Sequence, residues 1–147
     1  MELLGNGSPA AAAQVLQRAS TAEPASRSVR EALARAQFDA GRYAEAADNF
    51  RMIVEASPSD DYAHFGLGLA LARTGQHAAA AEYLALAAAM RPDVRHYTEA
   101  LRSVRATLRA QEDARQPRPD ARQPRPDARQ PRPDASTQSD ATTDDNR

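Results

Sequence analysis

The three histidines of this chain are the first residues to weigh, because imidazole is the commonest metal ligand and a frequent general base. His64, His77 and His96 are the only ones, no two of them stand four residues apart, and cysteine is absent. This spacing does not favour a zinc site, and we expect ordinary packed or surface histidines. No arrangement of Ser, His and acid stands out either. We therefore expect no catalytic residues, no metal and no cofactor, and a protein that is not an enzyme.

Gly66-Leu67-Gly68 is the other short segment that could bind a ligand, since glycine-rich loops after a strand cradle phosphates. Here the segment lies inside an apolar pattern of helical period, with no strand predicted before it and no Lys after it. We interpret it as the interior of a helix.

The composition limits the remaining classes of function. All 19 basic residues are Arg, they stand against 20 acidic residues, and the net charge of the 147-residue chain is -1. Such a balance gives no long-range attraction to nucleic acid or to anionic membrane. No apolar run approaches the roughly 20 residues that span a bilayer, and the start does not resemble a signal peptide, so we expect a cytoplasmic protein. Abundant Ala without Lys is typical of a GC-rich bacterial genome, such as that of an actinobacterium.

A repeat of 34 residues organises the first two thirds of the chain. Residues 27–60 align with residues 61–94 without a gap. The matched pairs are Leu33 with Leu67, Ala34 with Gly68, Gly41 with Gly75, Ala46 with Ala80, Phe50 with Leu84, and Pro58 with Pro92. Such a period is the signature of a helical repeat array.

Each period predicts two helices. Gly41 and Gly75 stand between two apolar segments of helical period, where one helix ends and a tight turn begins. The prolines at the ends of the periods close the second helix, because proline lacks the N–H that a helix interior needs. Ser59 and Asp93 are then the expected caps of the helices that follow.

The two ends of the array differ from its middle. Residues 9–22 predict a single leading helix with Val15, Leu16 and Ala19 on one side. Residues 93–112 predict a closing helix, with an apolar stripe on one side and a polar side opposite. The stripe comprises Val94, Tyr97, Leu101, Val104 and Leu108, and the polar side comprises Arg102, Arg105 and Arg109.

The register of small residues, central Gly and closing Pro resembles the tetratricopeptide repeat family. The resemblance implies an all-α solenoid of helical hairpins with two full repeats, a leading half-repeat and a capping helix. The segments are a partial repeat at 1–26, repeats at 27–60 and 61–94, a cap at 95–112, and a tail at 113–147.

The resemblance also implies a concave surface, lined by the first helix of each repeat, that holds an extended peptide or a helix of another protein. The expected partner-binding residues are Arg35, Phe38, Tyr62, Phe65, Leu69 and Arg73. Further groove-facing positions are Glu31, Asp39, His96, Glu99 and Ser103. The alternative for the aromatic residues is packing between neighbouring repeats. A clamp for an acidic chaperone tail is not expected, because the chain has no Lys.

The tail, residues 113–147, repeats DARQPRP three times and then becomes acidic. It contains no Val, Leu, Ile, Phe, Tyr or Trp, so we expect it to be disordered. We expect a non-catalytic adaptor that binds a protein, with neither nucleic acid nor membrane as a partner. Two alternatives stay open: an RNA- or ribosome-associated factor that uses the Arg-Pro tail, and a homo-oligomer that assembles through the leading half-repeat.

Overall fold

The computed structural model describes residues 7–117 and contains six helices and no strand in that part of the chain. The helices are α1 (Pro9–Ala22), α2 (Arg27–Asp39), α3 (Tyr43–Ala56), α4 (Asp61–Arg73), α5 (His77–Met90) and α6 (Arg95–Arg115). The predicted all-α class is therefore confirmed. The closing helix was predicted to end at residue 112, but α6 continues through Arg115 into the predicted tail. The rest of that tail, residues 118–147, and residues 1–6 lie outside the described part, so its predicted disorder is not tested. None of the described helices is both long and apolar enough to cross a membrane.

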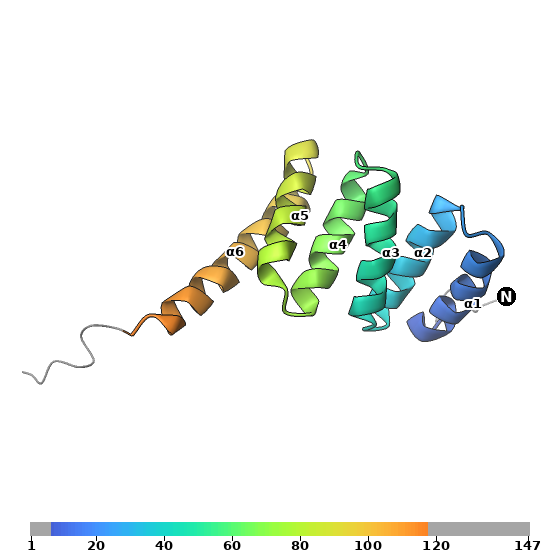
Figure 1. Cartoon of the computed structure of the whole chain (residues 1–147), viewed down its shortest axis with the longest axis horizontal. Coiled ribbons are helices and arrows are strands. Elements are labelled where there is room, and N and C mark those ends of the chain that lie inside the picture. The colour runs from blue at the N-terminus through green and yellow to red at the C-terminus, as the bar shows by residue number, and fades with distance from the viewer. Residues whose placement is uncertain (1–6, 118–147) are drawn as a thin grey trace, which may run out of the picture. The chain divides into compact units, whose positions relative to one another are not determined.

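The helices form two layers (Figure 1). Each helix packs against its neighbours in sequence, so the chain advances along a row from α1 to α6. Beyond these pairs, α4 also contacts both α2 and α6, whereas α3 contacts neither α1 nor α5. The α2, α4 and α6 layer is thus the more closely spaced one. A row of helices that is closer on one side curves toward that side, so these three helices form the concave inner surface.

Gly41 and Gly75 make the turn inside each helical hairpin, as the sequence predicts. Their φ angles are 79° and 85°, in the left-handed region that L-residues with a Cβ rarely adopt. Nothing lies within 4 Å of a Cβ built on either glycine, so backbone conformation alone requires glycine there.

The predicted caps of the later helices are wrong by one residue. Asp60, not Ser59, precedes α4, and its carboxylate accepts the backbone N–H of Ala63 at 3.0 Å. The helix α6 begins after Val94, which supplies no side-chain cap. Asp93 pairs instead with the guanidinium of Arg91, at 2.9 Å. After both closing prolines, the next helix begins one residue later than the pattern indicates.

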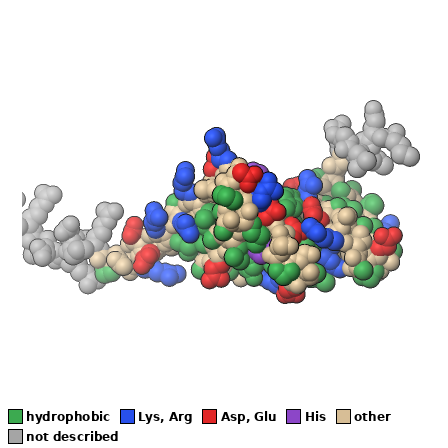
Figure 2. All heavy atoms as spheres, turned by 90° about the horizontal axis from the view of Figure 1, so that it is seen from above, with side chains coloured by type: hydrophobic (Ala, Val, Ile, Leu, Met, Phe, Trp, Pro, Cys, Tyr) green, Lys and Arg blue, Asp and Glu red, His purple; other side chains and the backbone are tan. Residues whose placement is uncertain are grey.

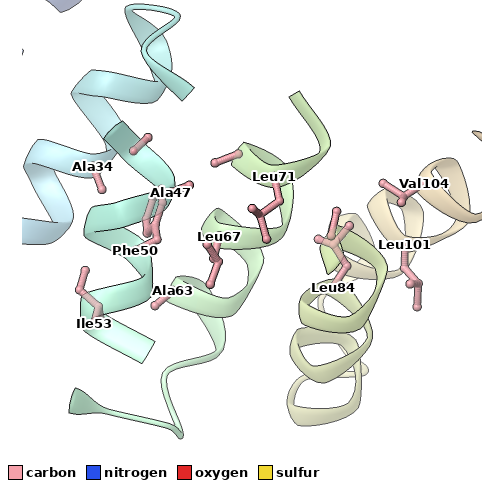
Figure 3. Close-up of a cluster of buried hydrophobic side chains, with 13 residues drawn as sticks. Ala34, Ala47, Phe50, Ile53, Ala63, Leu67, Leu71, Leu84, Leu101 and Val104 are labelled. Atoms are coloured by element: carbon pink, nitrogen blue, oxygen red, sulfur yellow. The ribbon is translucent and has the colours of Figure 1, made fainter. Parts of the chain in front are cut away.

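Small residues let the inner and outer helices approach closely. Ala34, Ala46 and Ala80 are fully buried, and the larger side chains of Leu67 and Leu84 fill the space around them. Figure 3 shows this cluster continuing from α3 through α4 and α5 to α6. The segment Gly66-Leu67-Gly68 lies within α4, which confirms its interpretation as helix interior.

The two end helices bury one side each. On α6 the middle of the predicted stripe is confirmed, because Tyr97, Leu101 and Val104 are buried and the arginines of the opposite side are exposed. Its two ends are only half-buried: Val94 lies just before the helix, and Leu108 lies near its C-terminal end. On α1 the predicted helix is confirmed over Pro9–Ala22, and of the apolar residues predicted on one side Leu16 and Ala19 are half-buried whereas Val15 is 65% exposed. The described residues provide no helix for the Val15 side to pack against.

Candidate functional site

A hollow of about 230 Å³ opens on the inner surface between α2 and α4. Its lining consists of Arg35, Phe38, Asp39, Phe50, Tyr62, Phe65, Gly66 and Leu69. Five of the six residues predicted to bind a partner therefore meet around one cavity. The sixth, Arg73, is not part of the lining, but its guanidinium carbon lies 5.6 Å from the centre of the Phe38 ring.

The α4 wall of the hollow follows from helical spacing. Tyr62, Phe65 and Leu69 stand three and four residues apart, so they project from the same side of the helix. Phe38 supplies the facing apolar surface from α2, one turn after Arg35. The hollow therefore has apolar walls with a few charged groups among them, which is the usual make-up of a ligand pocket.

The floor of the hollow comes from two residues that the sequence-based prediction missed. Phe50 reaches in from α3 and is only 2% exposed. Its ring lies so close to Gly66 that a Cβ built on this glycine would be 2.5 Å from Cε1. Glycine at position 66 therefore creates the room in which the ring forms the floor. The signal in the sequence was a glycine inside a helical pattern, which often marks close packing.

Two arginines flank the hollow. The guanidinium carbon of Arg35 lies 6.0 Å from the ring centre of Tyr62. Arg73 lies over Phe38 and Tyr43 and donates a hydrogen bond of 3.1 Å to the Tyr43 hydroxyl. Within residues 7–117 neither arginine forms an ion pair. Both cations are thus held beside aromatic faces, in a position to meet an anionic group of a ligand.

The electrostatic character of the hollow is mixed. Burial raises the pKa of the Tyr62 phenol above its ordinary value, and the charge of Arg35 opposes this shift. The carboxylates of Glu31 and Asp39 raise the pKa of the same phenol further. Tyr62 therefore stays neutral and can act as a hydrogen-bond donor. A ligand meets both cations and carboxylates here, so the site is not a simple anion-binding patch.

Phe65 also has a structural role. Its ring centre lies 4.7 Å from that of Tyr97 and 5.1 Å from that of His96, both on α6. The packing interpretation therefore applies to Phe65 alongside its place in the hollow. Leu69, one turn after Phe65 on α4, is half-buried and lines the hollow, as does Arg35 of α2. We therefore choose Leu69 and Arg35, rather than Phe65 with its ring contacts to α6, to probe ligand binding.

The remaining groove-facing positions are spread more widely. Glu99 and Ser103 are exposed on α6 and do not line the hollow.

Tyr97 donates a hydrogen bond of 2.7 Å to the carboxylate of Asp61, which ties α6 to the start of α4. Burial, together with this hydrogen bond, raises the pKa of the Tyr97 phenol well above its usual range. The neutral Tyr97 side chain therefore joins α6 to α4 beside the hollow.

The histidines do not converge. His64 is buried in α4, with Nδ1 2.7 Å from the carbonyl oxygen of Asp60, and is thus a packed histidine. His96 contacts Phe65, as described, and His77 begins α5. In the part of the chain that the structure describes, no three His, Asp or Glu side chains gather as metal ligands would.

The part of the chain that the repeat occupies also matches known protein families. Residues 1–61 and residues 37–108 match two models of the tetratricopeptide repeat. No curated protein matches the chain. Among solved structures, the MamA RS-1 ArsTM double mutant has a TM-score of 0.69 at 20% identity, covering 76% of this chain and 63% of that one.

A second solved structure, MamA MSR-1, has a TM-score of 0.66 at 21% identity, and the match covers 76% of this chain and 64% of that one. This chain thus spans less than two thirds of the length of either protein. At such identities the likeness concerns the fold, which is the same solenoid of helical hairpins.

Proposed function

Because this chain belongs to the tetratricopeptide repeat family, we propose that it is a non-catalytic adaptor that holds a partner protein on its inner surface. The partner inserts an apolar side chain of a peptide or helix into the hollow between α2 and α4. The observation that carries the proposal is the meeting of five expected partner-binding residues around this one cavity.

The size and lining of the hollow indicate the kind of side chain that fits. A hollow of about 230 Å³ accommodates one large apolar side chain and leaves space for the partner backbone that carries it. Phe50, Phe65 and Leu69 offer it apolar contact, and burial of a single Leu or Phe side chain stabilises a complex by about 1.5–3 kcal/mol. A partner bound by this residue alone would bind weakly, so neighbouring polar contacts are needed.

The arginines supply those polar contacts. Arg35 lies at the hollow itself and Arg73 lies beyond Phe38, so a carboxylate next to the apolar anchor can meet one of them. Hydrogen bonds to charged groups contribute about 1.5–3 kcal/mol each. The Asp39 carboxylate disfavours a ligand with dense negative charge. We therefore expect a motif with a single acidic residue beside a Leu, Met or aromatic residue.

A pull-down from native lysate with matched baits tests this proposal. The groove bait carries Arg35→Ala and Leu69→Glu. The control bait carries Met52→Glu and Leu86→Glu, two outer-layer positions that are 49% and 47% exposed. Both baits change the net charge by the same amount, so a difference between them reports the location of the site. Circular dichroism confirms beforehand that each bait is folded.

The proposal predicts a protein partner that the wild type and the control bait capture and the groove bait loses. A partner retained by the groove bait would contradict the site. Nuclease treatment before elution addresses the RNA alternative, whose tail lies outside the described residues. Binding that disappears with nuclease and is steeply salt-dependent would move the function from the groove to the tail.

A further inference from the structure

The last helix, α6, has one side that no other described helix covers. The inner helices α2 and α4 each contact two outer helices, whereas α6 contacts only one outer helix, α5, besides α4. We call the uncovered side the terminal face of α6. It carries a hollow of about 340 Å³ that is lined by Thr98, Leu101, Arg102, Arg105, Ala106 and Arg109.

The repeat register shows what lies at this face in the earlier repeats. The corresponding positions are Arg102 with Gly68, and Arg105 with Gln37. Gly68 packs so closely against α5 that a Cβ built on it would lie 2.7 Å from Cγ of Leu84. Gln37 donates a hydrogen bond of 3.3 Å to the carboxylate of Glu45 on α3. In both earlier repeats, this side of the inner helix therefore holds the outer helix of the same repeat.

The chain does not turn back at the point where the earlier repeats do. Gly41 and Gly75 make the turns between inner and outer helix, and Arg109 stands at the corresponding position. There α6 continues without a break to Arg115. The sequence of residues 117–133 then holds six prolines, which lack the N–H that a helix interior needs. This sequence is therefore unsuited to be the outer helix of α6.

The terminal face is cationic, unlike its counterparts on α2 and α4. Arg102, Arg105 and Arg109 are exposed and stand three and four residues apart, so they project from one side of the helix. Within residues 7–117 none of the three forms an ion pair. Figure 2 shows arginine side chains projecting along the α6 end. An apolar helix packed here would bury these charges without partners, which is unfavourable.

We propose that an acidic helix of another protein docks on the terminal face, in the place of an outer helix. One carboxylate of that helix meets Arg105, as the carboxylate of Glu45 meets Gln37 in the first repeat. A second carboxylate meets Arg102, and Leu101 offers apolar contact between the arginines. Hydrogen bonds between guanidinium and carboxylate groups are stronger than those between neutral groups. This contact is separate from the hollow between α2 and α4 and does not depend on it.

A nucleic acid fits the terminal face less well than an acidic helix does. The lining of its hollow includes no aromatic side chain on which a base could stack. The net charge of the whole chain is -1, which gives no long-range attraction to a polyanion. The repeat fills the corresponding place with a helix twice. A protein helix is therefore favoured, and RNA serves as a competing probe in the test.

The probe is a synthetic peptide with the sequence of α3, residues 43–56, and the change Ala46→Glu. The register of the first repeat places its Glu45 near Arg105. The new carboxylate at position 46 lies near Arg102, because position 80 of the second repeat lies beside the glycine that Arg102 replaces. The peptide thus presents two carboxylates to the two arginines.

Two further features of the peptide make the test interpretable. An isolated helix of this length is marginal in water, so an amide bond between Ala44→Lys and Asp48 keeps the peptide helical. Both positions are exposed on α3 and lie away from the contact. A matched peptide has the same amide bond, retains Ala46 and carries Glu45→Gln. It lacks both facing carboxylates and is otherwise the same.

Fluorescence anisotropy of the labelled peptide measures its affinity for the full chain at about 50 mM salt, where charges are weakly screened. The dissociation constant should be roughly 10–100 μM, because a single helix buries less area than a standard interface. The matched peptide should bind at least about fivefold more weakly. The Arg102→Gln/Arg105→Gln variant should bind the acidic peptide at least about fivefold more weakly as well.

Two control variants change the net charge by the same amount as the Arg102→Gln/Arg105→Gln variant. Arg18→Gln/Arg51→Gln alters α1 and α3, which do not contact α6, and should bind the acidic peptide normally. Arg35→Ala/Leu69→Glu alters the groove and should bind it normally too. Absence of binding up to about 1 mM peptide, or an equal loss in either control, would overturn the proposal.

Two competing occupants are measured with the same proteins. A labelled single-stranded RNA should bind more weakly than the acidic peptide. Sedimentation velocity should give the same mass for the wild type and the Arg102→Gln/Arg105→Gln variant. Tighter binding of RNA that depends on these arginines would assign the face to nucleic acid and overturn the proposal. Self-association of the wild type that the variant loses would assign the face to a second copy and would overturn it equally.

A crosslinking experiment locates the peptide on α6, and the absence of cysteine from the chain leaves only the introduced thiols. Thr98 corresponds to Arg30, whose guanidinium donates a hydrogen bond of 3.1 Å to Asn49 of α3. A peptide with Asn49→Cys should therefore form a disulfide with a Thr98→Cys chain. The yield should be several-fold higher than with Ser103→Cys, an exposed position outside the hollow. Equal yields at the two positions would refute docking on the terminal face.

Discussion

Replacement of Gly68 by alanine tests the close approach of α4 and α5. In the interior of an ordinary helix, Gly→Ala stabilises the folded state by about 1 kcal/mol. Here the added Cβ would lie 2.7 Å from Cγ of Leu84, so that one of the two helices must yield by about 0.7 Å to reach an ordinary contact. Overpacking of this kind costs about 1–3 kcal/mol. Because the gain in helix propensity offsets about 1 kcal/mol of this cost, we expect Gly68→Ala to lower the free energy of unfolding by about 0–2 kcal/mol rather than raise it.

A double-mutant cycle separates the steric effect from helix propensity. Leu84→Ala alone should cost about 2–5 kcal/mol, because Leu84 is fully buried. In that background the Cγ and Cδ2 atoms of Leu84 are gone, and the next nearest atom, the carbonyl oxygen of Ala80, lies at 3.2 Å. Gly68→Ala should then be neutral or stabilising by up to about 1 kcal/mol, which gives a coupling energy of roughly 1–3 kcal/mol.

Urea titrations followed by far-UV circular dichroism supply the four free energies of unfolding. The reasoning is refuted if Gly68→Ala stabilises the wild-type chain as it would an exposed helix. Equal effects of Gly68→Ala in the two backgrounds would likewise show that the helices do not meet at this point.

Three further predictions concern the turns, the cap and the tie to α6. Asp60→Ala should lower the free energy of unfolding by about 1–2 kcal/mol, because it removes the α4 cap together with the ion pair between Asp60 and Arg27. Ser59→Ala should change it by less than about 0.5 kcal/mol, and equal effects in chemical denaturation would contradict the cap assignment. Gly75→Ala should cost about 1–2 kcal/mol through its positive φ, and an unchanged melting temperature would argue against this turn. The folded pKa of Tyr97 is raised, so its stabilising contribution is complete below pH about 10 and is lost as the pH rises further. Tyr97→Phe should lower the free energy of unfolding at neutral pH, because it removes the hydrogen bond to Asp61. It should also weaken the loss of stability at alkaline pH, and an equal loss in wild type and variant would disprove the role of this phenol.

The repeat period made most of the fold predictable, because the same small, large and turn residues recur in register. Gly41 and Gly75 fixed the turns, since their backbone conformation is a local property of glycine. The caps were harder to predict. Ser59 and Asp60 can both cap a helix, and only the path of the chain after Pro58 decides between them.

The candidate site was predictable in its inner-helix residues and not in its floor. Leu69 and Arg35 follow from the resemblance to the tetratricopeptide repeat, which implies that the first helix of each repeat lines the concave surface. Phe50 reads as a core residue in the sequence, and it reaches the hollow only because Gly66 leaves room for its ring. The exposure of Val15 could not be predicted from periodicity either, because a helical stripe does not reveal whether a neighbouring helix is present to cover it.

The affinity of a selected peptide tests the central proposal, binding in the groove, most directly. Peptides selected from a random display library on the wild-type chain are titrated against three proteins by fluorescence anisotropy: wild type, Arg35→Ala/Leu69→Glu, and Met52→Glu/Leu86→Glu. The account predicts peptides with an apolar anchor beside an acidic residue, bound at least about tenfold more weakly by the groove variant and normally by the control. Equal affinity for the wild type and the groove variant would contradict it.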